Sequence, residues 1–444
     1  MKHFFYILTI LILATGIAEA AEAPFSYLID IQKDTAHIKL KYKPIQPDST
    51  VFIYGDEGYG GMKDLFAGIK KIKSTAKMRL SITERKIVLY HQSNNDITIT
   101  YDIIDTHRPE QKVVGEMFRP ISTANYFFSL SHTLFLTPQI SDSLKNELEI
   151  SVTLSKNNTF PVFCAFAPEL SPGKAVVLPY WCVMESLVTG ADDLHVEKRR
   201  MDGVDNYAVL RIRKDNQYNL PRFMEFFEKF LKAMSKFWGK PDAEFYSVVA
   251  GPFLDIDYHE ISGTAFMNGF HVKYSGDTVL KNDRTIYTVA HEMVHRYIGS
   301  GIITMGGDNQ WFDEGFTDYT TWYLCANYGI MPRESLAREV ARTKAELNTF
   351  GTKDLPNSEV LKHFWEGHEY EKLPYYRGAL FAAALDRRLG EIGKFTYRDM
   401  MLALKKCAQS RGGKLTPDDF VGVVSRFIPE AEIRTMMKEI VKTD

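Results

Sequence analysis

The spacing of apolar residues divides the chain into two parts of different structural kind. Between residues 24 and about 215, apolar residues recur at every second position in short runs, one of which is Leu148, Ile150, Val152 and Leu154. A period of two is typical of a β-strand that buries one face. Turn-forming clusters, such as the glycine-rich residues 58–61, separate the runs. The pattern predicts an antiparallel β domain over residues 24–215, with its last strand at residues 207–213.

From about residue 216 onward, the apolar period becomes that of an α-helix. A first helical stripe includes Phe223, Phe227, Phe230 and Met234, and a single apolar strand follows at residues 245–249. The remainder is predicted to be nearly all helical, over residues 334–347, 377–389, 397–410, 417–427 and 433–441. The predicted fold class is therefore α+β, with an N-terminal antiparallel β domain followed by a mostly helical domain over residues 216–444.

Composition adds size and charge to this picture. Of the 444 residues, 45% are hydrophobic and 13% aromatic, enough to bury substantial cores. The aromatic-rich residues 126–135 are accordingly interpreted as packed sheet core rather than as a ligand surface. Lys plus Arg total 54 against 56 for Asp plus Glu, a net charge of -2. This balance gives no electrostatic case for nucleic acid or an anionic membrane, so the expected partner is a peptide, a protein substrate or a small molecule.

The first residues have the pattern of a secretory signal peptide. Lys2 begins a short basic region, residues 4–14 are apolar but too few to span a bilayer with ease, and small-x-small cleavage sites end at Ala20 and Ala23. We expect residues 1–23 to be removed. The mature protein would then be secreted or periplasmic, without stable membrane insertion.

Cysteine usage leaves one question open. Cys164 and Cys182 flank a stretch with proline and glycine that could fold back and let the two thiols pair, as in many exported proteins. Cys325 and Cys407 lie in apolar helical patterns and are interpreted as buried thiols. None of the four has zinc-ligand spacing to another.

Within the helical part, His291, Glu292 and His295 form the pattern His-Glu-x-x-His. Two histidines four residues apart lie on one face of a helix, so both imidazoles can reach one metal ion. Glu292, on the same turn, can act as the general base toward a water molecule that the metal activates. Asp283 is a candidate N-cap and Gly299 a C-terminal stop, which places the motif on a helix. The alternative is an ordinary helix with one hydrogen-bonded core histidine.

A third ligand is available further along the chain. Catalytic zinc takes three protein ligands and leaves one position open. Eighteen residues separate His295 from Glu314, which lies in a second predicted helix capped by Asn309. We predict that His291, His295 and Glu314 hold one zinc ion per chain. Asp318 follows Glu314 by one turn and is predicted to orient His291, because a metal-bound histidine normally donates its other ring hydrogen to an acceptor; the alternative for Asp318 is a simple surface position.

These residues resemble a known group of enzymes. The pattern of His291, Glu292, His295 and Glu314 resembles the gluzincin metallopeptidases, which include thermolysin-like and aminopeptidase N-like enzymes. The run WFDEGFTDY at residues 311–319 is similar to the glycyl aminopeptidase family. The run LPYYRGAL at residues 373–380 resembles the segment in which these families place a catalytic tyrosine three residues before a glycine. The resemblance covers roughly residues 215–444. It implies a thermolysin-like catalytic domain, peptide substrates and, at Tyr375, a hydrogen-bond donor to the developing oxyanion.

One segment departs from these families. Their aminopeptidases carry Gly-Ala-Met-Glu-Asn, or a relative of it, before the first zinc histidine, and its glutamate binds the free amino terminus of the substrate. Here the corresponding stretch contains Gly263, Thr264, Ala265 and Met267, with Met267 in the place of the glutamate. The strand can still pair with an extended peptide through main-chain hydrogen bonds. These four residues are predicted to bind substrate, and exopeptidase and endopeptidase activity both stay open.

The sequence as a whole predicts a secreted zinc metallopeptidase, a hydrolase in which the metal activates water for attack on a peptide bond. Two other interpretations remain: a catalytically silent, zinc-containing peptide-binding protein, and a zinc hydrolase of non-peptide substrates on the same scaffold. Asp257 or Glu260 could supply the acid that Met267 lacks. No feature of the sequence predicts the oligomeric state.

Overall fold

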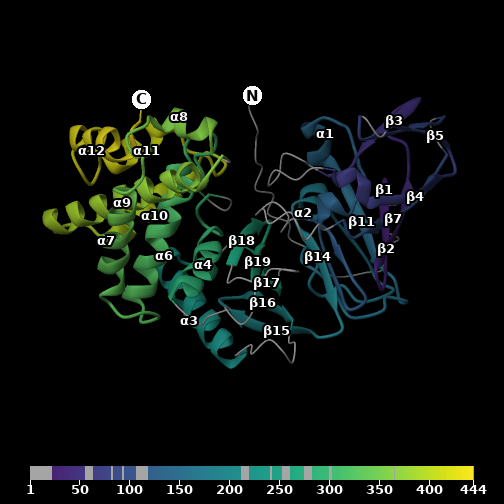
Figure 1. Cartoon of the computed structure of the whole chain (residues 1–444), viewed down its shortest axis with the longest axis horizontal. Helices are drawn as coiled ribbons and strands as arrows, with labels where there is room; N and C mark the ends of the chain where they lie inside the picture. Colours follow the sequence, from purple (N-terminus) through teal and green to yellow (C-terminus); the bar gives the residue numbers. More distant parts are fainter. Residues whose placement is uncertain are drawn as a thin grey trace.

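The structure is a computed structural model of the chain. It describes residues 23–55, 64–81, 84–92, 95–106, 119–211, 220–240, 243–252, 261–274, 283–299, 303–364 and 366–443. All but the last residue of the predicted signal peptide lies outside this set. Figure 1 shows the N-terminal strands on one side of the molecule, the helices on the other and a further sheet between them. The predicted α+β class is therefore confirmed.

The N-terminal part contains a six-stranded sheet with the order β13-β11-β1-β2-β7-β4. Burial alternates along its strands as predicted, and β11 buries Ile150, Val152 and Leu154 on one face. The pair β1–β11 is parallel and the other pairs are antiparallel, so this sheet is mixed and not purely antiparallel as predicted. A parallel pair needs a long crossover, which here contains the intervening strands. The strands are β1 (Phe25–Gln32), β2 (Thr35–Tyr42), β4 (Ile69–Ser74), β7 (Ile97–Ile104), β11 (Glu149–Leu154) and β13 (Ala175–Pro179).

Two four-stranded sheets complete this part, with the orders β10-β3-β6-β5 and β12-β14-β9-β8. The aromatic-rich stretch forms β9, which is buried along its whole length, so its interpretation as sheet core is confirmed. The strands are β3 (Ser49–Ile53), β5 (Lys77–Ser81), β6 (Lys86–Tyr90), β8 (Ile121–Ser122), β9 (Tyr126–Leu130), β10 (Thr137–Pro138), β12 (Val162–Cys164) and β14 (Leu187–Ala191). Short helical turns join them, at η2 (Leu65–Gly68), η4 (Ser131–Thr133), α1 (Asp142–Glu147) and α2 (Tyr180–Met184).

A five-stranded sheet with the order β15-β16-β17-β19-β18 lies between the two parts (Figure 1). The strand expected to close the N-terminal domain is β16, and it joins this sheet by pairing in parallel with β17. Alternate residues of β16 enter different cores: Ala208 and Leu210 pack with the helices, whereas Tyr207 and Val209 pack with the N-terminal sheets. The sheet thus separates the two cores. Its strands are β15 (Leu194–Met201), β16 (Val204–Arg211), β17 (Phe245–Pro252), β18 (Ile261–Phe266) and β19 (Gly269–Tyr274).

The helices form the second core. The apolar stripe predicted after residue 220 is buried on α3. The helix predicted from residue 377 is α9, which begins at His368, nine residues earlier (377 − 368), and contains Pro374. Because proline disfavours a helix interior, the sequence pattern did not predict the part of α9 before residue 377. The helices are α3 (Leu220–Trp238), α4 (Asp283–Val294), α5 (Gln310–Asp313), α6 (Gly315–Asn327), α7 (Ser335–Leu347), α8 (Asn357–Lys362), α9 (His368–Ile392), α10 (Tyr397–Gln409), α11 (Pro417–Val424), α12 (Glu430–Met436) and a π-turn, η5 (Met437–Val441).

Two further features bear on the sequence predictions. Cys164 and Cys182 are both free thiols, so the bridge that the sequence left open is not formed in this structure. The described part of the chain contains no helix with the length and apolar character needed to cross a membrane.

Candidate metal centre

The two motif histidines lie at the C-terminal end of α4. His291 belongs to the last turn of the helix, and His295 follows its end, with its backbone N–H still donating to the carbonyl of His291 at 3.2 Å. Gly299 follows at φ +84°, a conformation that favours glycine, and a Cβ atom there would lie 2.9 Å from Nδ1 of His295. Apolar neighbours fix the helix against the helical core, namely Val289, Ala290, Met293 and Val294. Both imidazoles are buried.

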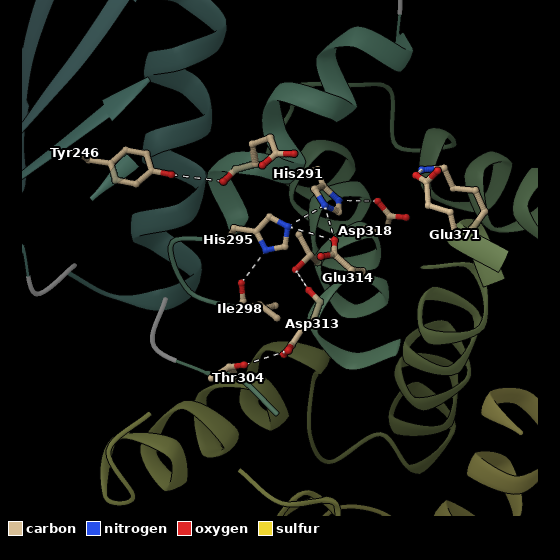
Figure 2. A network of polar contacts seen from close by, with 12 residues as sticks. Tyr246, His291, His295, Ile298, Thr304, Asp313, Glu314, Asp318 and Glu371 are labelled. Atoms are coloured by element: carbon tan, nitrogen blue, oxygen red, sulfur yellow. Dashed lines mark hydrogen bonds and ion pairs between the residues drawn. The ribbon is translucent and has the colours of Figure 1, made fainter. Parts of the chain in front are cut away.

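Three side-chain atoms of His291, His295 and Glu314 converge on one point (Figure 2). The Nε2 atoms of the two histidines lie 3.0 Å apart. Glu314 Oε2 lies 3.2 Å from Nε2 of His291 and 3.4 Å from Nε2 of His295. Ligands about 2.1 Å from a zinc ion at tetrahedral angles lie about 3.4 Å from one another. The three atoms therefore match three corners of a zinc tetrahedron.

The outer nitrogens of both rings face hydrogen-bond acceptors. His291 Nδ1 lies 2.8 Å from Oδ1 of Asp318, which is the contact predicted from the sequence, and His295 Nδ1 lies 2.9 Å from the carbonyl oxygen of Ile298 (Figure 2). Since these acceptors take the Nδ1 hydrogens, both Nε2 atoms of neutral rings present lone pairs to the centre. Two lone pairs and a carboxylate oxygen at these distances repel one another unless a cation lies between them. The donor set therefore fits a zinc ion.

The protonation of the metal-free residues supports the same conclusion. Burial alone would lower the pKa of His291, but Asp318 and Glu314 outweigh it and raise the pKa to about 10. The pKa of His295 is also raised, by Glu314 against the effect of burial. Burial would raise the pKa of Glu314, yet the two histidines hold it well below its ordinary value. Without metal, the carboxylates thus retain protons on the imidazoles, and a dication at the centre would replace that positive charge.

Glu314 lies at a break in the helix predicted around it. One short turn, α5, ends at Asp313, α6 begins at Gly315, and Glu314 has φ −97° and ψ −46° between them. Asn309 precedes α5 as predicted, but its side chain makes no capping bond and instead donates to the carbonyl of Gly306 at 3.1 Å. Directly after the break, Gly315 packs against the backbone of α9 so closely that no side chain would fit there.

Glu292 belongs to α4, and its side chain lies against the edge strand β18. A Cβ atom at Gly263 would lie 2.5 Å from Cγ and Cδ of Glu292, so the absence of a side chain at Gly263 makes room for the carboxylate. Burial raises the pKa of Glu292 above its ordinary value, with the two histidines opposing this effect. A carboxylate with a raised pKa is better matched to accepting and returning a proton near neutral pH.

Tyr375, on α9, lies beside His291. Its ring stacks on that of His291, with centroids 5.9 Å apart and an interplanar angle of 18°. Burial, and then the carboxylates of Glu314 and Glu371, raise the pKa of Tyr375 well above its ordinary value, so the hydroxyl stays protonated and can donate. Gly378 is the glycine three residues after Tyr375. Only a residue without a side chain fits at this position, against Gly315 and the carbonyl of Trp311. That contact brings the tyrosine beside the ligands.

The predicted substrate strand is β18, which pairs only with β19 among the described strands and lies beside α4. Gly263, Thr264 and Ala265 belong to it, and their role in binding substrate stays a prediction. Met267 lies beyond its end, in the turn to β19, where its backbone N–H donates to the carbonyl of Glu185 at 2.7 Å. Asp257 and Glu260, the possible replacement acids, lie outside the described residues.

Three contacts of the site were not predicted from the sequence. The carbonyl of Ile298 carries no side-chain signal. Asp313 is buried and accepts three hydrogen bonds, and only its place beside Glu314 could have drawn attention to it. Lys372 Nζ lies 2.6 Å from Glu371 and 4.6 Å from the centroid of the Tyr375 ring. Its spacing of three residues from the tyrosine is the available signal.

Sequence comparison finds no counterpart for this chain. No protein family profile matches it, and no curated protein sequence matches it. Relationships must therefore be sought in the arrangement of the backbone.

Solved structures with the same arrangement do exist. An aminopeptidase N family protein from Idiomarina loihiensis is 15% identical, has a TM-score of 0.74 and matches 94% of this chain and 75% of its own. An M1 zinc metallopeptidase from Deinococcus radiodurans, in a mutant form bound to a Tyr-Ser-Ala substrate, is 13% identical with a TM-score of 0.55, covering 94% and 93%. Yeast LTA4 hydrolase in complex with bestatin is 14% identical with a TM-score of 0.51, covering 94% and 66%.

The fold is therefore the gluzincin fold that the zinc motif predicts. More narrowly, it is the arrangement of the M1 zinc metallopeptidases of the aminopeptidase N type. At these identities the likeness establishes the fold and not the activity. The thermolysin-like character of the helical domain stays a prediction.

Proposed function

We propose that this chain is a zinc-dependent metallopeptidase that hydrolyses peptide bonds. One observation carries the proposal: Nε2 of His291, Nε2 of His295 and Oε2 of Glu314 lie 3.0 to 3.4 Å apart, with both outer imidazole nitrogens bonded to acceptors. This is the geometry of a catalytic zinc site with three protein ligands and one open position. The fold shared with M1 zinc metallopeptidases supports it.

Each residue around the centre has a distinct task. Zinc, when bound, supplies a Lewis acid that polarises a scissile carbonyl and makes a water molecule acidic near neutral pH. Glu292 takes the proton from the attacking water and later delivers it to the leaving amine. Tyr375 donates a hydrogen bond to the carbonyl oxygen as negative charge develops there, which is worth roughly 3 kcal/mol in comparable sites. Asp318 and the carbonyl of Ile298 hold the two imidazoles in the ligating orientation.

Substrate binding is assigned to the edge of β18 that faces away from β19, where no other described strand pairs with it. Gly263 places this edge directly against Glu292, so an extended peptide paired with the strand would run past the general base. The Deinococcus radiodurans relative binds a Tyr-Ser-Ala peptide, which supports a peptide as the substrate class. Because Met267 supplies no carboxylate, we propose that a free amino terminus is not required, and both internal and terminal bonds are candidates for cleavage.

The proposed place of action is outside the cytoplasm. The signal-peptide pattern over residues 1–23 supports export and cleavage, giving a secreted or periplasmic enzyme. Amino-terminal sequencing of the protein recovered from its native host tests this directly. A retained residue 1 in the mature protein would contradict it.

A peptide-library digestion tests the activity. The purified protein is assayed for zinc content, and its digestion products are read by mass spectrometry, with Glu292→Gln as the matched inactive control. One zinc per chain with cleavage that the control lacks supports the proposal. Zinc without any turnover would identify a silent peptide-binding protein, and turnover of esters but not peptides would identify a different zinc hydrolase. Cleavage at internal bonds separates an endopeptidase from an exopeptidase.

A further inference from the structure

The described residues of the linker between α4 and α5 contact two residues of the metal centre and its surroundings, His295 and Asp313. At its start, the carbonyl of Ile298 accepts from Nδ1 of His295 at 2.9 Å. Further along, Oγ1 of Thr304 donates at 3.1 Å, and the backbone N–H groups of Met305 and Gly306 donate at 3.0 Å each, to the carboxylate of Asp313, the last residue of α5 (Figure 2). We call the four linker residues Ile298, Thr304, Met305 and Gly306 the linker clamp. The linker clamp thus contacts one candidate ligand, His295, and the residue next to another, Asp313 beside Glu314.

Asp313 matters because it directly precedes Glu314. The turn α5 has only four residues and no side-chain cap, so it needs tertiary restraint to keep one orientation. The side chain of Asp313 uses both carboxylate oxygens to bond the linker, and its backbone carbonyl accepts from Oγ1 of Thr317 at 2.6 Å on the following helix. Asp313 therefore fixes the backbone on both sides of the third ligand.

The linker clamp is itself attached to the C-terminal helices. The backbone N–H of Thr304 donates to the carbonyl of Gly413 at 3.0 Å, and the N–H of Leu415 donates to the carbonyl of Thr304 at 2.9 Å. These bonds join the linker to the segment that precedes α11. Thr304 thus donates to Asp313 while its own backbone is fixed by hydrogen bonds to Gly413 and Leu415.

We propose that Asp313 is a positioning residue that, through the linker clamp, holds Glu314 and His295 in their ligating geometry and so sets the affinity for zinc. This inference rests on the proposed zinc site. A ligand set that is already ordered loses less conformational freedom when the ion binds, and residues that hydrogen-bond behind ligands typically contribute about 10- to 100-fold in metal affinity.

Zinc affinity of the full-length protein tests the inference. Asp313→Asn keeps the shape of the side chain but turns one acceptor oxygen into a donor that faces donors, so we expect zinc to bind about 10- to 100-fold more weakly. Thr304→Val removes one of the three donors and should weaken binding less. Asp308→Asn is the matched control, because Asp308 is an exposed acid on the same linker. Dissociation constants come from competition with a chromophoric chelator, and the absorption spectrum of the cobalt-substituted protein reports the ligand geometry.

The outcomes separate positioning from a general effect on folding. Weaker zinc binding and an altered cobalt spectrum in Asp313→Asn, with neither in Asp308→Asn, support the inference. Parent-like zinc affinity in a folded Asp313→Asn variant overturns it, even if the metal-free variant melts at a lower temperature. If Asp313→Asn does not fold, parent-like affinity in Thr304→Val overturns it. None of these measurements uses hydrolysis, so a parent protein that binds zinc but cleaves nothing contradicts the proposed function alone.

Discussion

The metal side and the substrate side of the site differ in how closely they follow the enzymes that the sequence resembles. On the metal side, His291, His295 and Glu314 are all present, and their ligand atoms meet at 3.0 to 3.4 Å. On the substrate side, β18 retains Gly263, but Met267 stands in place of the usual glutamate. Zinc demands particular donor atoms at fixed distances, whereas a strand edge binds a peptide main chain whatever side chains it carries. Catalytic capacity and substrate preference are therefore separable in this fold.

Glu292 touches both sides, and its substitution should have the largest effect. Glu292→Gln should retain about one zinc per chain while hydrolysis falls by about four orders of magnitude, because a positioned general base contributes up to that amount. His295→Ala should instead lose the metal, since it removes a ligand. Zinc analysis of the two variants alongside peptide assays separates the roles. A glutamine variant as active as the parent would refute the mechanism.

Tyr375 comes next. Tyr375→Phe should keep the fold and the zinc but reduce kcat by about two to three orders of magnitude with little change in KM, because its hydrogen bond matters mainly in the transition state. Tyr376→Phe is the control. Tyr376 faces away from the metal, stacking on Phe350 at 5.6 Å, so its effect on kcat should be small. The reverse ranking in steady-state kinetics would move the catalytic role to Tyr376.

Gly263 tests whether the two sides are in mechanical contact. Gly263→Ala would place a Cβ atom 2.5 Å from the side chain of Glu292 and displace the carboxylate. A displacement of about 1 Å at a reacting group costs about 100-fold in rate, and we expect kcat to fall by that factor with zinc retained. Gly422→Ala is the matched control, because a Cβ atom there meets nothing within 4 Å. Equal activity of the two variants would show that Glu292 tolerates a side chain at this position.

On the metal side, the affinity for zinc should depend on pH. Against the effect of burial, Asp318 and Glu314 raise the pKa of His291 to about 10, so the metal-free site is protonated at neutral pH. Zinc must displace that proton, and each displaced proton lowers the apparent affinity about tenfold per pH unit below the pKa. Displacement of the His291 proton alone should therefore weaken zinc binding about 100-fold between pH 8 and pH 6. Asp318→Asn should flatten the dependence, and an affinity independent of pH would contradict the proton count.

The smallest effect is expected on the substrate side. Without a carboxylate at Met267, nothing on the described strand stabilises a desolvated ammonium, which is costly to bury unpaired. Acetylation of the amino terminus of a cleaved peptide should thus change kcat/KM by less than about tenfold, equivalent to about 1.4 kcal/mol. Met267→Glu should shift the preference toward the free amine. A hundredfold loss on acetylation would show that another acid has taken over.

The sequence predicts the metal side well because the chemistry restricts residue types and spacing. The convergence of His291, His295 and Glu314 and the contact of Asp318 with His291 could be predicted from four side chains alone, and the role of the three as zinc ligands stays a prediction. The carbonyl of Ile298 could not, because every residue carries one. The close contact of Gly315 with Gly378, next to the break at Glu314, could not be predicted either, because the two glycines lie far apart in the sequence.

The fold shows the same division between local and non-local information. The period of two predicted the β-rich character of the N-terminal part, and the period of 3.6 residues predicted the helices of the second part, since each depends on neighbouring residues only. The pairing of β16 with β17, across the predicted boundary at residue 215, depends on which strand lies alongside and leaves no local trace. The early start of α9 was hidden by Pro374, whose missing N–H normally argues against a helix.

The alternation of β16 between two cores limits how the chain can be divided. A fragment that starts at residue 216 would lack this strand. The edge of β17 that pairs with β16 would then be exposed, and exposed strand edges tend to pair with other chains. A fragment that ends there would leave Ala208 and Leu210 facing water. Since neither part can be completed alone, we expect both to melt in a single cooperative transition. Zinc bound at the proposed site, whose three candidate ligands all belong to the helical part, should then raise the melting temperature of the N-terminal sheets as well.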